Sequence, residues 1–383
     1  MMSTFGTTLD SIEARELINK AKGYTEEELA EELAEVRKTI VGLDTIPANN
    51  VVNFARLYKA YKSYVGENHI GALCSRCWPD FFTEFGTPVC SVLSLLNANG
   101  VSASCESDAY GALSMFIGSD LTGHDLTEGG AKYNGIGPQA SGMATCADSL
   151  AAIRQLVFDE KRCTGAELLE AVKHNWKGYE KLYALVNSSK VHHYGNDDDY
   201  ADELFRFMFE TYCSHIAGRK TPRGGTFSPG VYSVNANVAM GLNTNASVDG
   251  RKAGEAISDN MGPVHTDFGS HDINGPTAIV NSLTKVDHSL ATNGTLMNLR
   301  FPQEAVAGIE GRDNLASFIE EYIHKGAMHV QFNIMSAATM RAAQKKPEDY
   351  KDMLVRVAGY SAYFVELGKP LQKDLIQRTE LHF

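Results

Sequence analysis

The sequence predicts an α/β protein built from more than one folding unit, and three observations indicate this. The chain has 383 residues, whereas one domain usually holds about 100 to 200. In the first hundred residues, stretches with helical apolar spacing alternate with a short apolar run typical of a buried strand. A glycine-rich passage at 128–142 follows, in which apolar residues repeat at neither helical nor strand spacing. We therefore place a boundary directly after Gly123 and expect one unit at 1–123 and a second at 124–383.

The first unit begins with a clear helix start. Thr25 and Glu28 have the spacing of a capping box, in which each side chain bonds the backbone of the other residue. Apolar side chains then repeat at helical spacing, at Leu29, Leu33, Val36 and Ile40. Further along we expect a helix at 53–65, a strand at 71–77 and a helix at 89–97 that ends near Asn99.

The second unit starts with helices and continues with strands and loops. The apolar spacing predicts helices at 147–159 and 165–187, and another that ends near Ser214. After Thr221 we expect short strands at 277–286 and 295–301. In the stretch 328–334, apolar and polar residues alternate, so one strand face is apolar and the other polar. Such a strand either lines a barrel or forms an edge with one wet face.

Composition and charge exclude several functions. Apolar residues make up 43% of the chain and charged residues 21%, as in ordinary globular proteins. The net charge of -12 would repel a phosphate backbone, so we expect no nucleic-acid partner. No apolar run approaches the roughly 18 residues needed to span a bilayer, and the first residues do not resemble a secretion signal. We expect a cytoplasmic protein without membrane contact.

The seven cysteines lack the dense spacing of a disulfide framework, so we expect reduced thiols. Cys74 and Cys77 form a lone Cys-x-x-Cys pair. Structural zinc normally takes four ligands, and no second pair follows at metal-site spacing. Ordinary buried or surface thiols are the simpler interpretation.

The most specific motif lies near the C-terminus, where Gly359 stands between apolar and aromatic neighbours. Taken alone, it is a turn glycine that supplies a positive φ. The surrounding stretch 354–380, LVRVAGYSAYFVELGKPLQKDLIQRTE, closely resembles the glycyl radical signature of the pyruvate formate-lyase and radical dehydratase family. The resemblance extends over 124–383, through GGAKYNGIGPQ, YGNDDDYADEL, TPRGG, DGRKAGE, NGPTAIVNS, GTLMNLRF and HVQFN.

The resemblance implies a radical on Gly359, in a loop shaped by its neighbours Arg356, Val357, Ala358, Tyr360 and Ser361. It also implies a partner, an activating enzyme with an iron-sulfur cluster and S-adenosylmethionine that removes the glycine hydrogen, while the chain itself binds no cofactor. Because such a radical survives only away from water and oxygen, we expect the loop tip to be buried. Asn134, Gln139 and the 274–280 loop either line a substrate pocket or make ordinary turn hydrogen bonds.

Family members are lyases, dehydratases or formate acetyltransferases, which cleave C–C or C–X bonds of small metabolites under anaerobic conditions. Their thiyl radical forms on a cysteine in a Gly-Cys-x-Glu-like loop before the GGAKYN passage, and this chain has no such loop. The thiyl cysteine is therefore unassigned, and activity of the chain alone is in question. The alternative is a non-catalytic radical module that lends its glycine loop to a partner, or an inactive fusion.

The fold implied by the resemblance is the second half of a ten-stranded α/β barrel, with a glycine radical domain at about 255–383. A half barrel exposes strand edges and core-facing side chains. We therefore expect a homo-oligomer, or a partner chain that supplies the missing half.

Residues 5–123 resemble a different family, the L-fucose and L-arabinose isomerases, through CSRCWPDFF, CSVLSLLNANGV, CESDAYGALSMFI and LTG. In that family a glutamate, an aspartate and a histidine hold manganese for aldose-ketose interconversion. Glu106 matches the glutamate, whereas the aspartate would fall near Gly130 and is absent. A single carboxylate does not hold a metal, so we expect no bound manganese, and a metal-dependent isomerase is a further alternative function.

Overall fold

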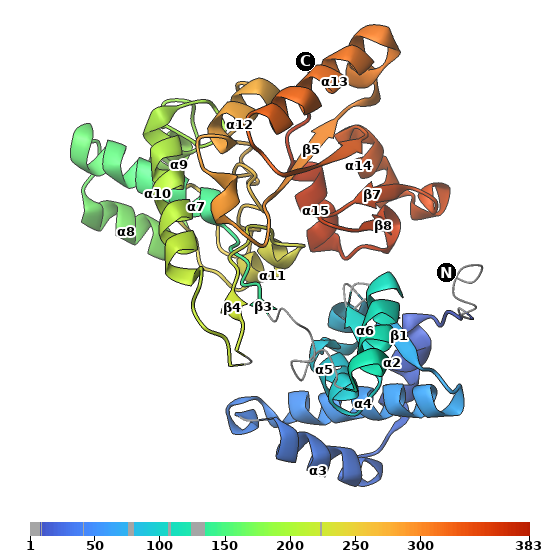
Figure 1. Cartoon of the computed structure of the whole chain (residues 1–383). Helices are drawn as coiled ribbons and strands as arrows, with labels where there is room; N and C mark the ends of the chain where they lie inside the picture. The colour runs from blue at the N-terminus through green and yellow to red at the C-terminus, as the bar shows by residue number, and fades with distance from the viewer. Residues whose placement is uncertain are drawn as a thin grey trace. The chain divides into compact units, whose positions relative to one another are not determined.

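The computed structural model describes residues 8, 10–40, 42–75, 80–105, 109–123, 135–222 and 224–383. The chain divides into two compact units, Met1–Asn134 and Gly135–Phe383 (Figure 1). Each is described by itself. Within the described residues, no helix combines the length and the apolar character that a bilayer crossing requires.

The first unit packs helices around a two-stranded parallel sheet. Its elements are α2 (Ala14–Gly23), α3 (Ala30–Thr39), α4 (Ala48–Glu67), β1 (Ala72–Ser75), α5 (Cys90–Ala98), β2 (Ser102–Cys105) and α6 (Ala109–Thr122). Ala72 of β1 lies opposite Ser102 of β2. The core forms where Leu57 and Tyr58 of α4 meet Val92 of α5.

The predictions for this unit are confirmed where the structure describes them. The Thr25 backbone N–H donates to the Glu28 carboxylate at 2.8 Å, and the Glu28 N–H donates to the Thr25 hydroxyl at 3.4 Å, which is the expected capping box. The helix predicted at 53–65 lies within α4, and the helix predicted at 89–97 overlaps α5 except at its first residue. The predicted strand at 71–77 contains β1. Cys77 and Glu106 lie outside the described residues.

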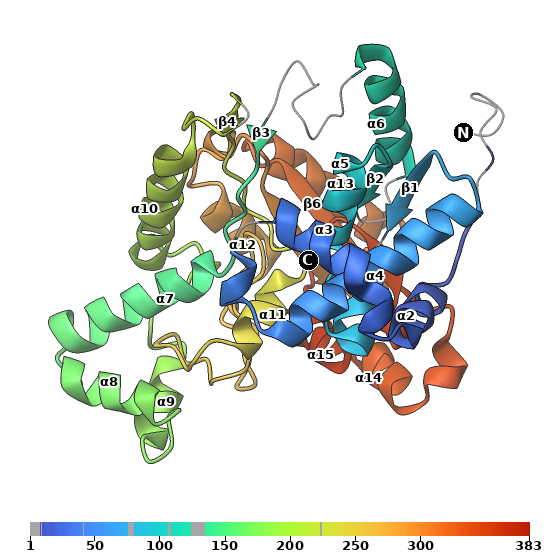
Figure 2. The ribbon, with the colours of Figure 1, turned by 90° about the horizontal axis from the view of Figure 1, so that it is seen from below.

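The second unit contains helices along its whole length and most of its strands in its later part. Its helices are α7 (Met143–Ile153), α8 (Gly165–Lys173), α9 (Glu180–Val186), α10 (Asp199–Ile216), α11 (Ala236–Leu242), α12 (Pro276–Leu283), α13 (Gly308–His324), α14 (Ala337–Lys345) and α15 (Lys369–Gln377). Helix α7 continues as a π-helical turn over Arg154–Asp159. Figure 2 shows α8 and α9 below α7 and its π-helical continuation.

Parallel pairing connects segments that are far apart in the sequence. Strand β3 (Gly135–Ile136) pairs with β4 (Thr226–Phe227), and β5 (Leu296–Phe301) pairs with β6 (His329–Ile334). A parallel bridge between Val231 and Thr295 connects the two pairs. Helices α7 to α10, then α11 and α12, then α13 lie between successive segments in the chain. The α/β prediction is therefore confirmed.

The core of this unit lies between α7, α10, α12 and β5. Tyr194 stacks on Phe205 of α10 with ring centroids 4.0 Å apart, and both side chains are fully buried. Ala147 of α7, Leu283 of α12 and Leu299 of β5 complete the same cluster. The site residues described below are attached to the elements around this core.

Two secondary-structure predictions for this unit are wrong. The stretch 165–187 is two helices, because the chain turns at Asn175 and Trp176, both with positive φ. This turn buries the Trp176 ring, whose Nε1–H donates to the Arg251 carbonyl at 3.3 Å. The stretch 277–286 was predicted as a strand, yet its first part is helix α12. Pro276 occupies the first turn, where its missing N–H costs nothing.

Candidate functional site

The glycine loop connects two short antiparallel strands, β7 (Leu354–Arg356) and β8 (Ser361–Tyr363). Gly359 lies in the turn with φ 83°, and a backbone bond from the Val357 N–H to the Tyr360 carbonyl closes it at 3.0 Å. A Cβ placed on Gly359 would meet nothing within 4 Å. Its positive φ therefore favours glycine here, rather than a lack of space.

Strand β6 holds this loop through its polar face. The Gly359 N–H donates to Oε1 of Gln331 at 3.1 Å. The Asn333 side chain accepts from the Arg356 N–H at 2.8 Å and donates to the Arg356 carbonyl at 2.7 Å. Both side chains are buried, with exposed fractions of 5% and 7%. A wet edge is therefore the wrong interpretation for Gln331 and Asn333, because the loop covers them.

A second anchor comes from α15 and the residues after it. The Arg378 Nη1 donates to the Val357 carbonyl at 3.2 Å, while Nη2 contacts carboxylate oxygens of Asp374 at 3.1 Å and Asp259 at 3.4 Å. All three charged side chains are buried. Burial lowers the pKa of Arg378, but the two carboxylates more than offset this and raise it. Arg378 therefore stays charged and holds the loop.

The remaining loop side chains also have fixed partners. Arg356 donates through Nη1 to the Ser361 hydroxyl at 3.1 Å, and the Asn235 amide donates to the Tyr360 hydroxyl at 2.7 Å. Val357 and Ala358 are buried at 0% and 1% exposure. The structure thus brings the predicted loop residues together around Gly359.

The prediction that the tip of the glycine loop is buried is wrong. Gly359 itself is exposed, although Val357 and Ala358 before it are buried. The two strands direct these neighbours into the unit, and the tip projects past them with nothing within 4 Å of its Cβ direction.

The other predicted site residues do not join the glycine loop. Gln139 pairs with Gly230 in a parallel bridge, and its Nε2 donates to the Gly137 carbonyl at 3.2 Å. The Asn274 amide donates to the Asn196 carbonyl at 3.1 Å and also lines a small cavity of about 130 Å³. Asn134 lies outside the described residues. Gln139 and Asn274 therefore both make local hydrogen bonds, and Asn274 also lines a cavity.

Three of the described cysteines, Cys146, Cys163 and Cys213, give no sign of an activated thiol. Burial raises the pKa of Cys146, of Cys163 and, to about 11, of Cys213. Cys213 is inside α10 and Cys146 inside α7. The thiyl cysteine stays unassigned among the residues that the structure describes.

Sequence reasoning missed the anchors Arg378, Asp374 and Asp259. Gln331 and Asn333 were visible as the polar face of a strand, but nothing in the sequence indicated that this face holds the glycine. Arg378 belongs to the signature stretch itself, directly after the last residue of α15.

Gly359 therefore lies in a positive-φ turn that β7 and β8 close and that buried polar side chains hold. Comparisons with known proteins show the family. Residues 110–241 match the family of pyruvate formate lyase-like proteins, and residues 261–365 match the glycine radical family. The C-terminal part of this chain belongs to the glycyl radical enzyme family, in which a radical S-adenosylmethionine enzyme installs the radical.

Individual relatives agree with this assignment. The chain is 87% identical over 263 residues to (2S)-3-sulfopropanediol dehydratase from Klebsiella oxytoca, a match that covers 69% of this chain and 32% of the relative. The solved glycerol-bound B12-independent glycerol dehydratase from Clostridium butyricum superposes with a TM-score of 0.66 at 33% identity, covering 93% of this chain and 43% of that chain. The chain spans about a third of the length of the curated relatives it matches.

A shorter match is of a different kind. The chain is 59% identical over 123 residues to sulfoquinovose isomerase from Clostridium sp. (strain MSTE9), covering 32% of this chain and 28% of the relative. The L-fucose and L-arabinose isomerase resemblance finds no support in the two family matches, which both fall at residue 110 or later.

Proposed function

We propose that this chain carries the radical-storing part of a glycyl radical enzyme of the dehydratase or lyase type, with Gly359 as the radical site. One observation carries the proposal. The Gly359 N–H, the Arg356 carbonyl and the Val357 carbonyl are each held by a buried side chain, so the loop is fixed at three of its residues. A turn that needed glycine only for its φ would not require these anchors.

The anchors suit the chemistry of a glycyl radical. When the Gly359 Cα–H bond breaks homolytically, the hydrogen atom leaves with one electron, and the other electron is shared with the adjacent amide nitrogen and carbonyl. This sharing requires a planar Cα, which glycine reaches because it has no side chain. Gln331 fixes the peptide on the nitrogen side of this Cα, and the exposed tip leaves the hydrogen within reach of a separate activating enzyme.

We propose a small hydroxylated or sulfonated metabolite as the substrate class. Matched relatives are named as dehydratases of sulfopropanediol and hydroxyproline and as an isethionate sulfite-lyase. These names share the loss of water or sulfite from a small molecule. The 87% identity makes (2S)-3-sulfopropanediol the first compound to test.

The proposal includes a cysteine-bearing loop supplied by another chain, together with the other half of a barrel. In this arrangement β6 and the glycine loop face the partner, and the exposed Gly359 tip becomes covered. Size-exclusion chromatography, thermal melting and an activity assay test the assembly. A monodisperse monomer that melts cooperatively and turns over substrate by itself would contradict it.

The radical site is tested by electron paramagnetic resonance. Anaerobic protein is treated with an activating enzyme, S-adenosylmethionine and a reductant, then exposed briefly to air and analysed by mass spectrometry. We expect a glycine doublet and oxygen-dependent cleavage at Gly359. Neither signal, with an activating enzyme proven on a full-length family member, would overturn the assignment.

A second experiment separates turnover by this chain from lending of its loop. The chain is co-expressed with a family member truncated before its own glycine loop, and dehydratase activity is measured anaerobically. Activity that needs both chains supports lending, whereas activity of this chain alone supports a complete site. Persistent inactivity, despite a confirmed radical, would weaken both the lending of the loop and the complete site.

The isomerase match favours a second candidate for the N-terminal segment. We assign its 123 residues to the segment before the glycine-rich passage, whose described part is the first compact unit. Manganese retained after dialysis in the wild type and lost in Glu106→Gln would support a sugar isomerase relative. Equal, negligible retention in both proteins would leave this segment without that chemistry.

A further inference from the structure

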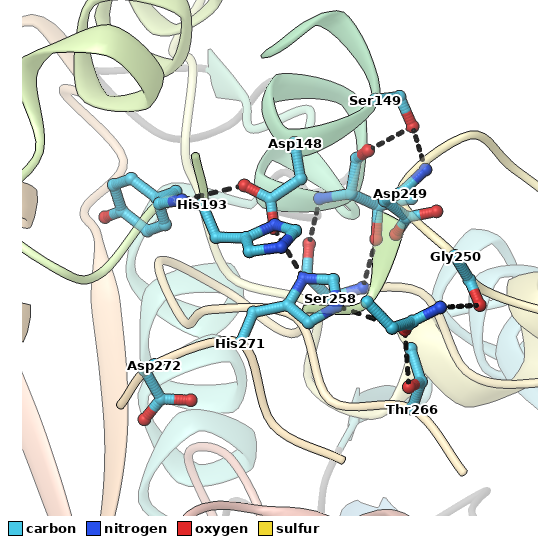
Figure 3. Close-up of polar contacts among 12 residues, drawn as sticks. Asp148, Ser149, His193, Asp249, Gly250, Ser258, Thr266, His271 and Asp272 are labelled. Atoms are coloured by element: carbon cyan, nitrogen blue, oxygen red, sulfur yellow. Dashed lines mark hydrogen bonds and ion pairs between the residues drawn. The ribbon is translucent and has the colours of Figure 1, made fainter. Parts of the chain in front are cut away.

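A buried cluster in the second unit joins three segments that are distant in sequence. Asp148 lies in α7, His193 precedes α10 and His271 precedes α12. One ligand-type atom from each side chain lies within 4.8 Å of those from the other two. Oδ2 of Asp148 is 2.8 Å from Nδ1 of His271 and 3.3 Å from Nδ1 of His193. Figure 3 shows the two rings beside the carboxylate.

His193 lacks the hydrogen bonds that a buried imidazole normally makes. Only 5% of the residue is exposed, yet Nδ1 has only the 3.3 Å contact with Asp148, without hydrogen-bond geometry, and Nε2 has no hydrogen-bond partner among the described residues. An unpaired buried polar group costs about 1 to 3 kcal/mol. The ring lies over that of His271, with centroids 3.9 Å apart. A metal ion bound by a ring nitrogen of His193 would remove this cost for that nitrogen.

His271 lies between two hydrogen-bond acceptors. The Asn187 Nδ2 donates to the carbonyls of Tyr183 at 3.0 Å and Gly250 at 3.4 Å, which orients its Oδ1 toward Nε2 of His271 at 3.3 Å. Both neighbours of this ring are acceptors, the Asn187 oxygen beside Nε2 and the Asp148 oxygen 2.8 Å from Nδ1. A neutral imidazole has one N–H and can donate to only one of them. With that proton on Nε2, Nδ1 and the Asp148 oxygen are free to bind a metal ion together.

The Asp148 carboxylate is also oriented toward the two histidines. The Tyr194 N–H donates to Oδ1 of Asp148 at 2.8 Å, so that Oδ2 is directed at the two imidazoles (Figure 3). The fully buried Asp249 carboxylate has an unpartnered Oδ2, and the Ser149 hydroxyl accepts from its backbone N–H. Its negative charge acts on the same cluster. Such outer contacts are typical of metal centres.

We propose that Asp148, His193 and His271 bind a divalent first-row transition metal ion such as zinc. Two imidazoles and one carboxylate are nitrogen and oxygen donors that suit this class rather than calcium or magnesium. Both histidines also line the cavity of about 130 Å³, together with Asn187 and Asn196. This cavity provides the path of entry and room for water in the open coordination position.

Cobalt(II) titration of the full chain tests the site. After removal of metals with a chelator, Co²⁺ alone is added and visible absorption is recorded. We expect one ion per chain with the d–d spectrum of nitrogen and oxygen ligands, displaced by Zn²⁺. A thiolate-to-cobalt charge-transfer band would place the ion on cysteines and overturn the proposal.

Variants locate the ion. His193→Gln should weaken Co²⁺ binding at least tenfold, whereas His265→Gln should leave it unchanged. His265 is the matched control because it also faces one carboxylate, Asp272 at 3.3 Å, and belongs to no such three-residue cluster among the described residues. Wild-type affinity in His193→Gln would overturn the proposal.

A measurement on the wild type remains decisive even if His193→Gln does not fold. The proton spectrum of the Co²⁺-loaded chain should contain two strongly shifted, exchangeable ring N–H signals, one from each coordinated histidine. No shifted exchangeable signal, or a signal that persists when Co²⁺ is replaced by Zn²⁺, would exclude coordination by these rings. If a proton on an imidazolium occupies the site in place of a metal ion, the exchangeable signal persists when Co²⁺ is replaced by Zn²⁺.

Discussion

Gly359 combines two properties that only one residue type offers. Its φ of 83° lies in the left-handed region, and its Cα carries no side chain that would hinder a planar radical. The open space around its Cβ direction separates these two properties experimentally, because a methyl group fits there without a clash.

Replacement of Gly359 by alanine should lower the free energy of unfolding by about 1 to 2 kcal/mol, because an L residue is strained at this φ. It should also abolish the glycine doublet and the oxygen-dependent cleavage. Thermal unfolding and electron paramagnetic resonance measure the two effects.

The matched control is Gly326→Ala. Gly326 has a φ of 86° and equally open surroundings, so its alanine variant should lose similar stability and keep the doublet. A doublet that survives in Gly359→Ala, or disappears in Gly326→Ala, would contradict the assignment of the radical.

Gln331→Leu should speed hydrogen exchange of the Gly359 amide about fivefold, because one net hydrogen bond is worth about 1 kcal/mol. The Gly359 N–H loses its acceptor in this variant. Exchange is followed by mass spectrometry of the peptide that contains the loop. Gln331→Glu retains an acceptor oxygen and serves as control, and equal exchange in both variants would show that Gln331 does not hold the loop.

At the scale of elements, Lys285 ties the end of α12 to the start of α10. Its Nζ lies 2.8 Å from Asp202, 2.7 Å from Asp199 and 3.0 Å from Asp197. The Asp202 side chain is fully buried and also accepts from the Ser282 hydroxyl at 2.9 Å. Burial raises the pKa of Asp202 to about 6, although Lys285 and Ser282 oppose this.

This raised pKa predicts a pH dependence of stability. A carboxyl whose folded pKa lies above its unfolded value stabilises the fold most at pH below about 4, and this contribution is lost as the pH rises through about 6. Asp202→Asn lacks this dependence. Its unfolding free energy should therefore rise relative to the wild type between pH 4 and 7, by about 2 to 3 kcal/mol.

Urea unfolding at several pH values measures the difference. Asp199→Asn is the matched control, because Asp199 contacts the same lysine from an exposed position, with 81% of its side chain accessible. The difference between this variant and the wild type should change little over the same range. A flat profile for Asp202→Asn would show that its buried carboxyl is not destabilised by ionisation.

At the scale of the whole molecule, each compact unit has its own hydrophobic core. Leu57 belongs to the core of the first unit and Leu283 to the core of the second, and both are fully buried. The two clusters share no residue.

We therefore expect core truncations to act within one unit. Leu57→Ala should lower the opening free energy by about 3 kcal/mol in the first unit alone, and Leu283→Ala should do the same in the second. Hydrogen exchange mass spectrometry reads the two units separately, and each variant is the control for the other. Loss of protection in both units from either change would show that they unfold together.

Local sequence determined much of what was predicted correctly. The capping box of Thr25 and Glu28 needs only neighbouring residues, as do the apolar repeat of α4 and the alternation in β6. The glycine loop was also recognisable, because its motif is contiguous. The predictions for Glu106 and Asn134 stay predictions, because both residues lie outside the part of the chain that the structure describes.

Tertiary structure decided the features that depend on distant partners. Trp176 breaks a helix because its indole is buried against the Arg251 carbonyl, and the polar face of β6 is buried because the glycine loop covers it. The sequence contains Asp148, His193 and His271 at positions with no metal-site spacing, and only the packing of α7 against two loops brings them together. Sequence periodicity reports which side of an element is apolar, whereas the partner of a polar side chain is set by contacts between segments far apart in the chain.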